Sequence, residues 1–246
     1  MCGLLYKDFI AIRGKRLTWI LALSTVLYII LRICFPGTNT VGGIMDSVFC
    51  LGEFTVLWMG CSWINSAATK IVQFDKKQQI QGYLSSMPID QKTYVASKFI
   101  FIVIAAYVFF SLYIIWHIIS LSFMADNYFK DFSYLLASVA IPFVSSVLFV
   151  TATELLLYLI LGNGTAKIVK EIGIMLIGIL ILAYLLFGDL TIIENWGIEV
   201  LIHWAETHAF FLTMLSVFFP LVVLLFCYLF YRIAAKLYHW KEDADV

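Results

Sequence analysis

The acidic, basic and histidine side chains of this sequence match no catalytic motif in their spacing. A serine protease that works within a membrane needs a Gly-x-Ser-Gly nucleophile site, which is absent. A zinc site of the His-Glu-x-x-His type is also absent, and His203 and His208, five positions apart, fall on different faces of a helix. The sequence has no Walker A loop either. We therefore expect that this chain is not an enzyme.

Three charged residues lie within apolar segments, where a charge is costly and points to a function by default. Arg32 is near the outer end of the first segment, Asp46 is near the outer end of the second, and Glu53 is about two turns deeper. Three interpretations stay open: Arg32 pairs with one of the two acids, Arg32 only snorkels to the outer interface, or the three residues line an outward-facing cavity. We expect Glu154 to lie at the inner interface or to pair with an inner lysine, and His117 to hydrogen-bond between helices.

The composition decides the class of protein. Hydrophobic residues make up 63% of the 246 residues and charged residues only 13%, which is more apolar surface than a soluble domain of this size can bury. The apolar runs are continuous rather than alternating, so they predict α-helices in a lipid bilayer. The sequence therefore predicts an all-α integral membrane protein with one domain over residues 1–246, and no nucleic-acid partner is expected.

Six apolar segments are long enough to cross about 30 Å of hydrocarbon. They are expected near residues 17–35, 44–68, 98–124, 133–161, 171–188 and 209–235. With a cytosolic N-terminus, 14 of the 16 lysines and arginines fall on the inner side, as the positive-inside rule requires. This predicts six transmembrane helices with both termini inside, preceded by an amphipathic helix on the inner surface. The outer loop 189–208 is expected either to lie at the interface or to re-enter the membrane.

The longest polar interruption runs from Lys70 to Lys98. Four apolar residues within it share one face of a helix: Ile80, Tyr83, Leu84 and Met87. Pro88 ends that helix because it lacks an N–H group, and Asp90 can cap the next one. This pattern is typical of a short interfacial helix that anchors a loop, or of a docking element for a cytosolic partner. We favour the docking element.

Two segments of the sequence resemble the permease subunits of type-2 ABC transporters. Leu4–Phe9, with its Lys-Asp pair, is similar to the amphipathic connecting helix that opens those subunits. Gly82–Ile89, with Lys98 and Phe99 after it, resembles the Leu-Pro segment that follows their coupling helix between spans two and three. The chain looks most similar to the six-span permeases of Gram-positive bacteria that export phenol-soluble modulins and related amphipathic peptides.

This resemblance implies a multi-pass permease of the bacterial plasma membrane that pairs with a second permease copy. ATP and Mg²⁺ would bind to a separate ATP-binding subunit, so no cofactor is expected on this chain. The resemblance implies that a cytosolic coupling helix contacts that subunit through Asp75, Gln79, Ile80, Tyr83, Leu84, Met87 and Pro88. The expected function is ATP-driven export of amphipathic or hydrophobic substrates, such as small cytolytic or antimicrobial peptides. The alternative is a membrane anchor or sensor subunit that docks a cytosolic partner and transports nothing.

Overall fold

The computed structural model describes residues 2–11, 26, 30, 40–77, 90–123, 127–187, 203–204 and 207–237. The elements within these ranges are α1 Cys2–Ala11, α3 Thr40–Lys77, α5 Gln91–Phe123, α6 Asn127–Leu161, α7 Asn163–Phe187 and α10 Ala209–Leu237. Every one is an α-helix, so the prediction of an all-α protein is confirmed for this part of the chain. The predicted span 17–35, including Arg32, is almost wholly outside the described residues, as are Gln79–Pro88 and most of the loop 189–208.

The described helices are longer than the apolar segments that predicted them. The segment 44–68 corresponds to α3, which continues to Lys77, and the segment 171–188 corresponds to α7, which already begins at Asn163. The difference has a simple reason: hydropathy detects only the apolar part of a helix, whereas backbone hydrogen bonding continues through polar turns beyond it. The extra turns at the end of α3 carry Asp75 into the folded bundle.

The start of α5 and the end of α6 lie where the sequence predicted them, and residues next to each boundary explain its position. Asp90 precedes α5; its carbonyl accepts hydrogen bonds from the backbone N–H groups of Thr93 and Tyr94, and its Oδ1 accepts one from the N–H of Lys92 at 3.4 Å. This is N-cap geometry, as expected for an aspartate at this position. Gly162 separates α6 from α7 with a φ of 78°, a left-handed conformation that favours glycine.

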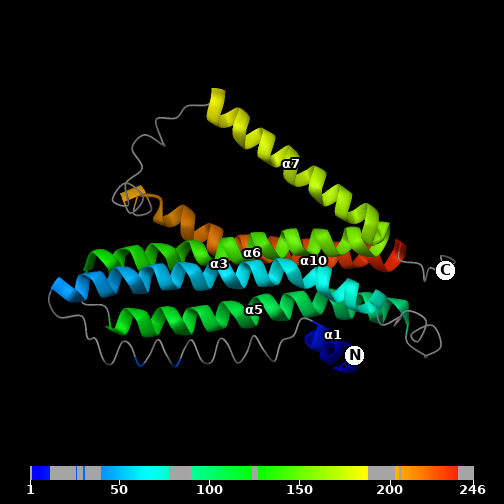
Figure 1. The fold of residues 1–246 in the computed structure, drawn as a ribbon, viewed down its shortest axis with the longest axis horizontal. Helices are drawn as coiled ribbons and strands as arrows, with labels where there is room; N and C mark the ends of the chain where they lie inside the picture. Colours follow the sequence, from blue (N-terminus) through cyan, green and yellow to red (C-terminus); the bar gives the residue numbers. More distant parts are fainter. Residues whose placement is uncertain are drawn as a thin grey trace.

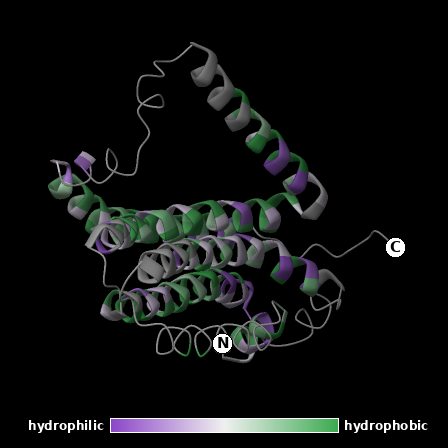
Figure 2. Cartoon of the chain, turned by 60° about the vertical axis from the view of Figure 1, so that its left-hand side comes forward, coloured by the Kyte–Doolittle hydropathy of each residue, from purple (hydrophilic) through white to green (hydrophobic). Residues whose placement is uncertain are grey.

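Four long helices, α3, α5, α6 and α10, lie side by side (Figure 1). Helix α6 contacts each of the other three, and α1 packs against α5 and α3 at one end of the bundle. Helix α7 touches α6 near the Gly162 turn and then diverges from the bundle (Figure 1). Hydrophobic residues follow the long helices along most of their length, and the hydrophilic ones concentrate toward the helix ends (Figure 2).

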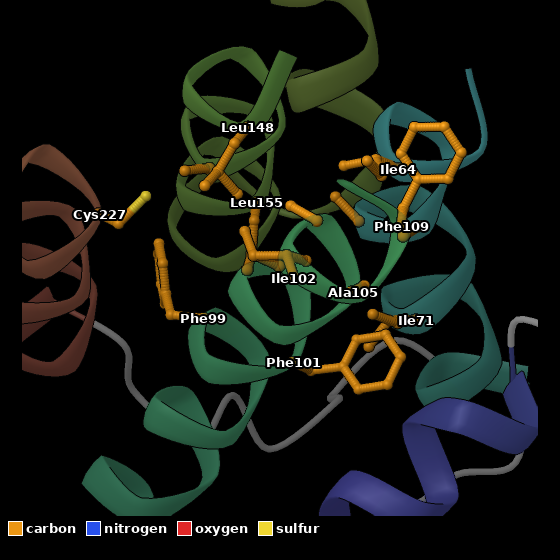
Figure 3. Packing of buried hydrophobic residues seen from close by; sticks show 14 of the residues in the cluster. Ile64, Ile71, Phe99, Phe101, Ile102, Ala105, Phe109, Leu148, Leu155 and Cys227 are labelled. Carbon is orange, nitrogen blue, oxygen red and sulfur yellow. The ribbon is translucent and has the colours of Figure 1, made fainter. Parts of the chain in front are cut away.

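The hydrophobic core forms where α3, α5, α6 and α10 meet (Figure 3). Ile64 of α3, Ile102 of α5 and Leu155 of α6 are fully buried in it. Phe109 of α5 lies so close to Gly60 of α3 that a side chain at position 60 would collide with its ring. The two helices approach closely at this point because glycine has no side chain, which is a common device in packed membrane helices.

Pro142 lies inside α6 without leaving a polar group unpaired. A proline lacks the N–H that would bond to the carbonyl four residues earlier, which here belongs to Ser138. Ser216 of α10 donates its hydroxyl hydrogen to that carbonyl at 3.1 Å. A neighbouring helix thus supplies the missing donor, which is how proline is tolerated in a lipid environment.

Three helices of the described part are long and apolar enough to cross a membrane: the segments Gln91–Ile119 of α5, Ser133–Leu161 of α6 and Ala209–Leu237 of α10. The chain is therefore a helical protein with three candidate spans in the described ranges, and the count of six stays a prediction.

Candidate functional site

Helix α1 brings one acid and one base to the end of the bundle. Leu4 and Asp8, four residues apart, share the face of α1 that is buried against the other helices, whereas Tyr6 and Ile10 are exposed. Asp8 is fully buried. Helix α1 forms as predicted, but its buried face carries the charge of Asp8 while Tyr6 and Ile10 are exposed, so an amphipathic helix on the inner membrane surface stays a prediction.

Asp75, near the end of α3, meets side chains from α1 and α5. Its carboxylate accepts a hydrogen bond from Lys7 Nζ at 2.5 Å and one from the Tyr94 hydroxyl at 2.6 Å. Lys7 binds Oδ1, whereas the Tyr94 hydroxyl binds Oδ2, and Lys98 Nζ also lies 2.5 Å from Oδ2. Asp75 itself is only 1% exposed. Its charge is thus compensated from both neighbouring helices.

Lys98 of α5 completes a four-charge network with Lys7, Asp8 and Asp75. Its ammonium group donates to Asp8 Oδ1 at 2.5 Å and contacts Asp75 at the same distance, with no exposure to solvent. The ring of Tyr94 lies 5.0 Å from Lys98 Nζ and 5.5 Å from Lys7 Nζ, within the range of cation–π attraction. Two acids and two bases leave the network without net charge, so it can stay buried.

The two carboxyl groups of this network differ in acidity. Burial raises the pKa of Asp8 above its ordinary value of 3.8, against the opposing effect of Lys98 and Lys7. Burial acts in the same direction on Asp75, but Lys98 and Lys7 outweigh it and hold the pKa of Asp75 below 3.8. The contacts explain the difference. Asp75 has close partners at both oxygens, whereas Asp8 Oδ2 is buried without a hydrogen-bond partner among the described residues.

The position of this network matters more than any chemistry it could perform. Helix α3 ends at Lys77 and α5 begins at Gln91, so the network binds the two ends of the segment 78–89 to each other and to α1. Of the predicted coupling residues, only Asp75 lies in the described part, and its side chain points into the fold. Its carboxylate is occupied by Lys7, Lys98 and Tyr94, and contact with a partner stays a prediction for Asp75 and for Gln79–Pro88.

Sequence reasoning did not bring Lys7, Asp8, Tyr94 and Lys98 together with Asp75. Lys7, Asp8 and Lys98 were noted only as part of a family likeness. One further signal was available: Tyr94 and Lys98 are four residues apart and thus share a helix face. The pairs Lys7–Asp75 and Asp8–Lys98, however, join residues that are 68 and 90 positions apart in the sequence, and spacing alone cannot pair groups at such distances.

A second polar cluster lies inside the bundle. Glu53 of α3, His117 of α5 and Ser133 of α6 are all buried. Ser133 donates to Glu53 Oε2 at 2.8 Å, and its Oγ lies 3.1 Å from His117 Nδ1. His117 therefore bonds between helices, as expected. The backbone of Asp46 lies in α3, but its side chain and all of Arg32 are outside the described part, so their pairing stays untested.

Glu154 of α6 is paired with Lys170, which is one of the two arrangements that the sequence left open, and the inner position of this lysine stays a prediction. Its Oε1 accepts a hydrogen bond from Lys170 of α7 and another from Thr69 of α3, each at 2.7 Å. Because Glu154 is only 5% exposed, these bonds anchor the start of α7 to α3 and α6. Within the described ranges, no three histidine, cysteine or acidic side chains gather as a metal site would require.

Comparison with known proteins gives one match. A family model described as "ABC-2 family transporter protein" matches residues 3–239, which is nearly the whole chain. No curated protein and no solved structure matches this chain.

Proposed function

We propose that this chain, which belongs to the ABC-2 family of transporter proteins, is the membrane permease subunit of an ABC transporter. The family, the apolar helices and the long candidate spans support a membrane protein with an ATP-binding partner subunit. The further proposal of six spans with inner termini in a bacterial plasma membrane is supported by the inner excess of lysine and arginine.

The observation that carries the proposal is the charge network of Lys7, Asp8, Asp75 and Lys98. It lies beside the connection 78–89, and positive-inside bias puts this connection on the cytosolic side. Buried ion pairs at 2.5 Å hold the last turns of α3 and the first turns of α5 together. A force applied to the connection by a cytosolic subunit would therefore move α3, α5 and α1 as one body.

The segment 78–89 is the proposed docking element for the ATP-binding subunit. The apolar stripe Ile80, Tyr83, Leu84 and Met87 would enter a cleft of that subunit, and ATP and Mg²⁺ would act there and not on this chain. A second permease copy, and outward transport of amphipathic peptides, belong to the same proposal and rest on the resemblance of Leu4–Phe9 and Gly82–Ile89 to peptide-exporting permeases.

Copurification tests the docking element directly. The double variant Tyr83→Ala/Leu84→Ala should release the ATP-binding subunit, because a buried tyrosine at an interface often contributes more than about 2 kcal/mol. The thermal stability of the permease should be unchanged. Tyr83→Leu is the matched control for general apolarity: a helix that only lies on the lipid surface tolerates it, whereas a shaped cleft does not. Full retention of the subunit by the double variant would refute the docking assignment.

A second measurement distinguishes a transporter from the alternative, an anchor or sensor subunit that transports nothing. A transporter in proteoliposomes should hydrolyse ATP faster when an amphipathic peptide is added. An anchor should retain its ATP-binding partner without that response.

A further inference from the structure

A pocket opens between α6 and α10 near the N-terminal ends of both helices. Its volume is about 470 Å³, within the range of roughly 300–1,000 Å³ that ligand sites occupy. Asp131 and Ala209 line one end, and Ile141 and Val217 line the other. Over the ten residues from Asp131 to Ile141 a helix rises about 15 Å. The pocket thus runs along two helices that carry no part of the charge network.

One face of each helix forms the pocket. On α6 the lining residues begin at Asp131 and recur three, four and seven positions later, and on α10 they begin at Ala209 and recur at the same intervals. Residues with this spacing share a helix face. Ser216, seven residues after Ala209, donates its hydroxyl hydrogen to the carbonyl of Ser138, seven residues after Asp131. The two faces therefore run side by side in matching register.

Three hydroxyl groups of the pocket have already used their hydrogens. Ser138 donates to the carbonyl of Leu135 at 2.7 Å, and Thr213 donates to the carbonyl of Ala209 at 2.8 Å. Ser216 donates to the carbonyl of Ser138 at 3.1 Å. A hydroxyl group has one hydrogen and two lone pairs. Each of these oxygens can thus accept a bond from a ligand, but it can donate one only by giving up its bond to the backbone.

The remaining polar groups of the lining are also acceptors. Asp131 is exposed, and an ionised carboxylate only accepts hydrogen bonds. The phenol of Tyr134 can accept as well as donate. Because three of the acceptors are hydroxyl oxygens with known bonds, the preference for a donor does not depend on Asp131 alone. The other walls are apolar side chains, among them Ile141, Leu212 and Val217.

We propose that this pocket binds a lipid whose headgroup carries a primary ammonium group. An ammonium group has three N–H donors and no acceptor, which complements a lining rich in acceptors. Its charge-assisted hydrogen bonds to Asp131 and Thr213 replace the water that the headgroup loses. The acyl chain lies against Ile141, Leu212 and Val217. The site needs no ATP-binding subunit, so it goes beyond the proposed function.

The size of the pocket favours a lipid over an amphipathic peptide. A helical peptide is at least about 10 Å wide with its side chains, so a length of about 15 Å occupies roughly 1,200 Å³. This is more than twice the volume of the pocket. A single acyl chain is far narrower. A lipid also reaches the space between two helices directly from the bilayer around the candidate spans Ser133–Leu161 and Ala209–Leu237.

Native mass spectrometry of the full chain, released from detergent, counts bound amphiphiles directly. The probe is dodecylamine, which has one chain and carries a primary ammonium group at neutral pH. One molecule should bind per chain, and binding should saturate. Dodecyltrimethylammonium has the same chain and charge but no N–H donor. It should bind at least about tenfold more weakly, because hydrogen bonds to charged groups are among the stronger ones.

Two variants test whether the probe binds in this pocket. Thr213→Val removes an acceptor at nearly constant volume, and Asp131→Asn removes the carboxylate. Each should weaken the binding of dodecylamine about tenfold. Thr153→Val is the matched control. Thr153 of α6 donates to the carbonyl of Phe149 at 2.9 Å in the same way as Thr213 bonds to Ala209, but it does not line the pocket. This variant should bind dodecylamine as the wild type does.

Equal binding of dodecylamine and dodecyltrimethylammonium would overturn the proposal, because charge and chain would then suffice without donors. Unchanged affinity in Thr213→Val or in Asp131→Asn would overturn it as well, since the probe would then bind elsewhere. Displacement of the probe by a lysine-containing amphipathic peptide, but not by a lipid with an ethanolamine headgroup, would refute the lipid and indicate a peptide site. None of these measurements involves the ATP-binding subunit, so their failure is distinct from a failure of the docking element.

Discussion

Removing Lys98 should destabilise the folded chain more than any other single change in the charge network. Lys98 has no exposure and contacts both Asp8 and Asp75 at 2.5 Å. Lys98→Met keeps a long apolar side chain in place, so little cavity forms. The variant leaves two buried carboxylates to share Lys7, and the network gains a net charge of −1.

The expected loss is about 3–5 kcal/mol of unfolding free energy, the usual cost of breaking a buried ion pair from one side. Lys7→Met is the matched control. Removing Lys7 leaves the same net charge of −1, but Lys7 is 19% exposed and has one close ion pair, with Asp75, whereas the fully buried Lys98 still contacts both acids in this variant. The loss of unfolding free energy in Lys7→Met should therefore be clearly smaller than in Lys98→Met.

A double variant tests whether charge is the cause. Lys98→Met together with Asp8→Asn restores neutrality, because Lys7 and Asp75 remain as a pair. It should recover part of the loss, and the double-mutant cycle gives the coupling energy. Unfolding free energies can be measured by titration with a denaturing detergent in mixed micelles. If Lys98→Met loses no more unfolding free energy than Lys7→Met, or if the cycle shows no coupling energy, the buried network is not formed in the folded chain.

The acidity of the two aspartates adds a pH dependence to the same experiment. The pKa of Asp75 lies below 3.8, so its contribution to stability is present above pH 3.8 and is lost as pH falls through its folded value. The pKa of Asp8 is raised, so protonation of Asp8 favours the folded state at low pH. Protonation of Asp8 also relieves the excess charge in Lys98→Met. The difference in unfolding free energy between wild type and Lys98→Met should therefore become smaller as the pH is lowered.

Two further predictions concern packing and the anchoring of α7. Gly60→Ala should destabilise the fold by about 1–3 kcal/mol because the added methyl group would collide with the buried ring of Phe109. Gly52→Ala is the control: its added methyl group would have no neighbouring atom within 4 Å, so it should be neutral or slightly stabilising. Equal unfolding midpoints for the two variants would contradict the close approach of α3 and α5. Lys170→Met leaves buried Glu154 with Thr69 alone and should cost about 1–3 kcal/mol. Lys167→Met breaks the exposed pair with Glu171, and the change in unfolding free energy should be near zero in the same assay.

Features that depend on neighbours along the chain could be predicted from the sequence. Asp90 caps α5 and Gly162 ends α6 because capping needs only side chains and backbone groups within one turn. The helical membrane class follows from continuous apolar runs, whose backbone must be satisfied internally in lipid. The pairing of Glu154 with a lysine could also be predicted, since Lys170 is only 16 residues away in the sequence, across a single turn.

The tertiary structure alone decided which charges are buried and what compensates them. Asp75 was predicted as part of a partner-facing helix, yet the structure encloses it between Lys7 and Lys98. Glu53 was considered as a partner for Arg32, and among the described residues it meets Ser133 and His117. Sequence patterns report the period of a helix, and hence which residues share a face. They do not report which face of another helix, 68 to 90 residues away, will lie against it, because that depends on how the bundle packs as a whole.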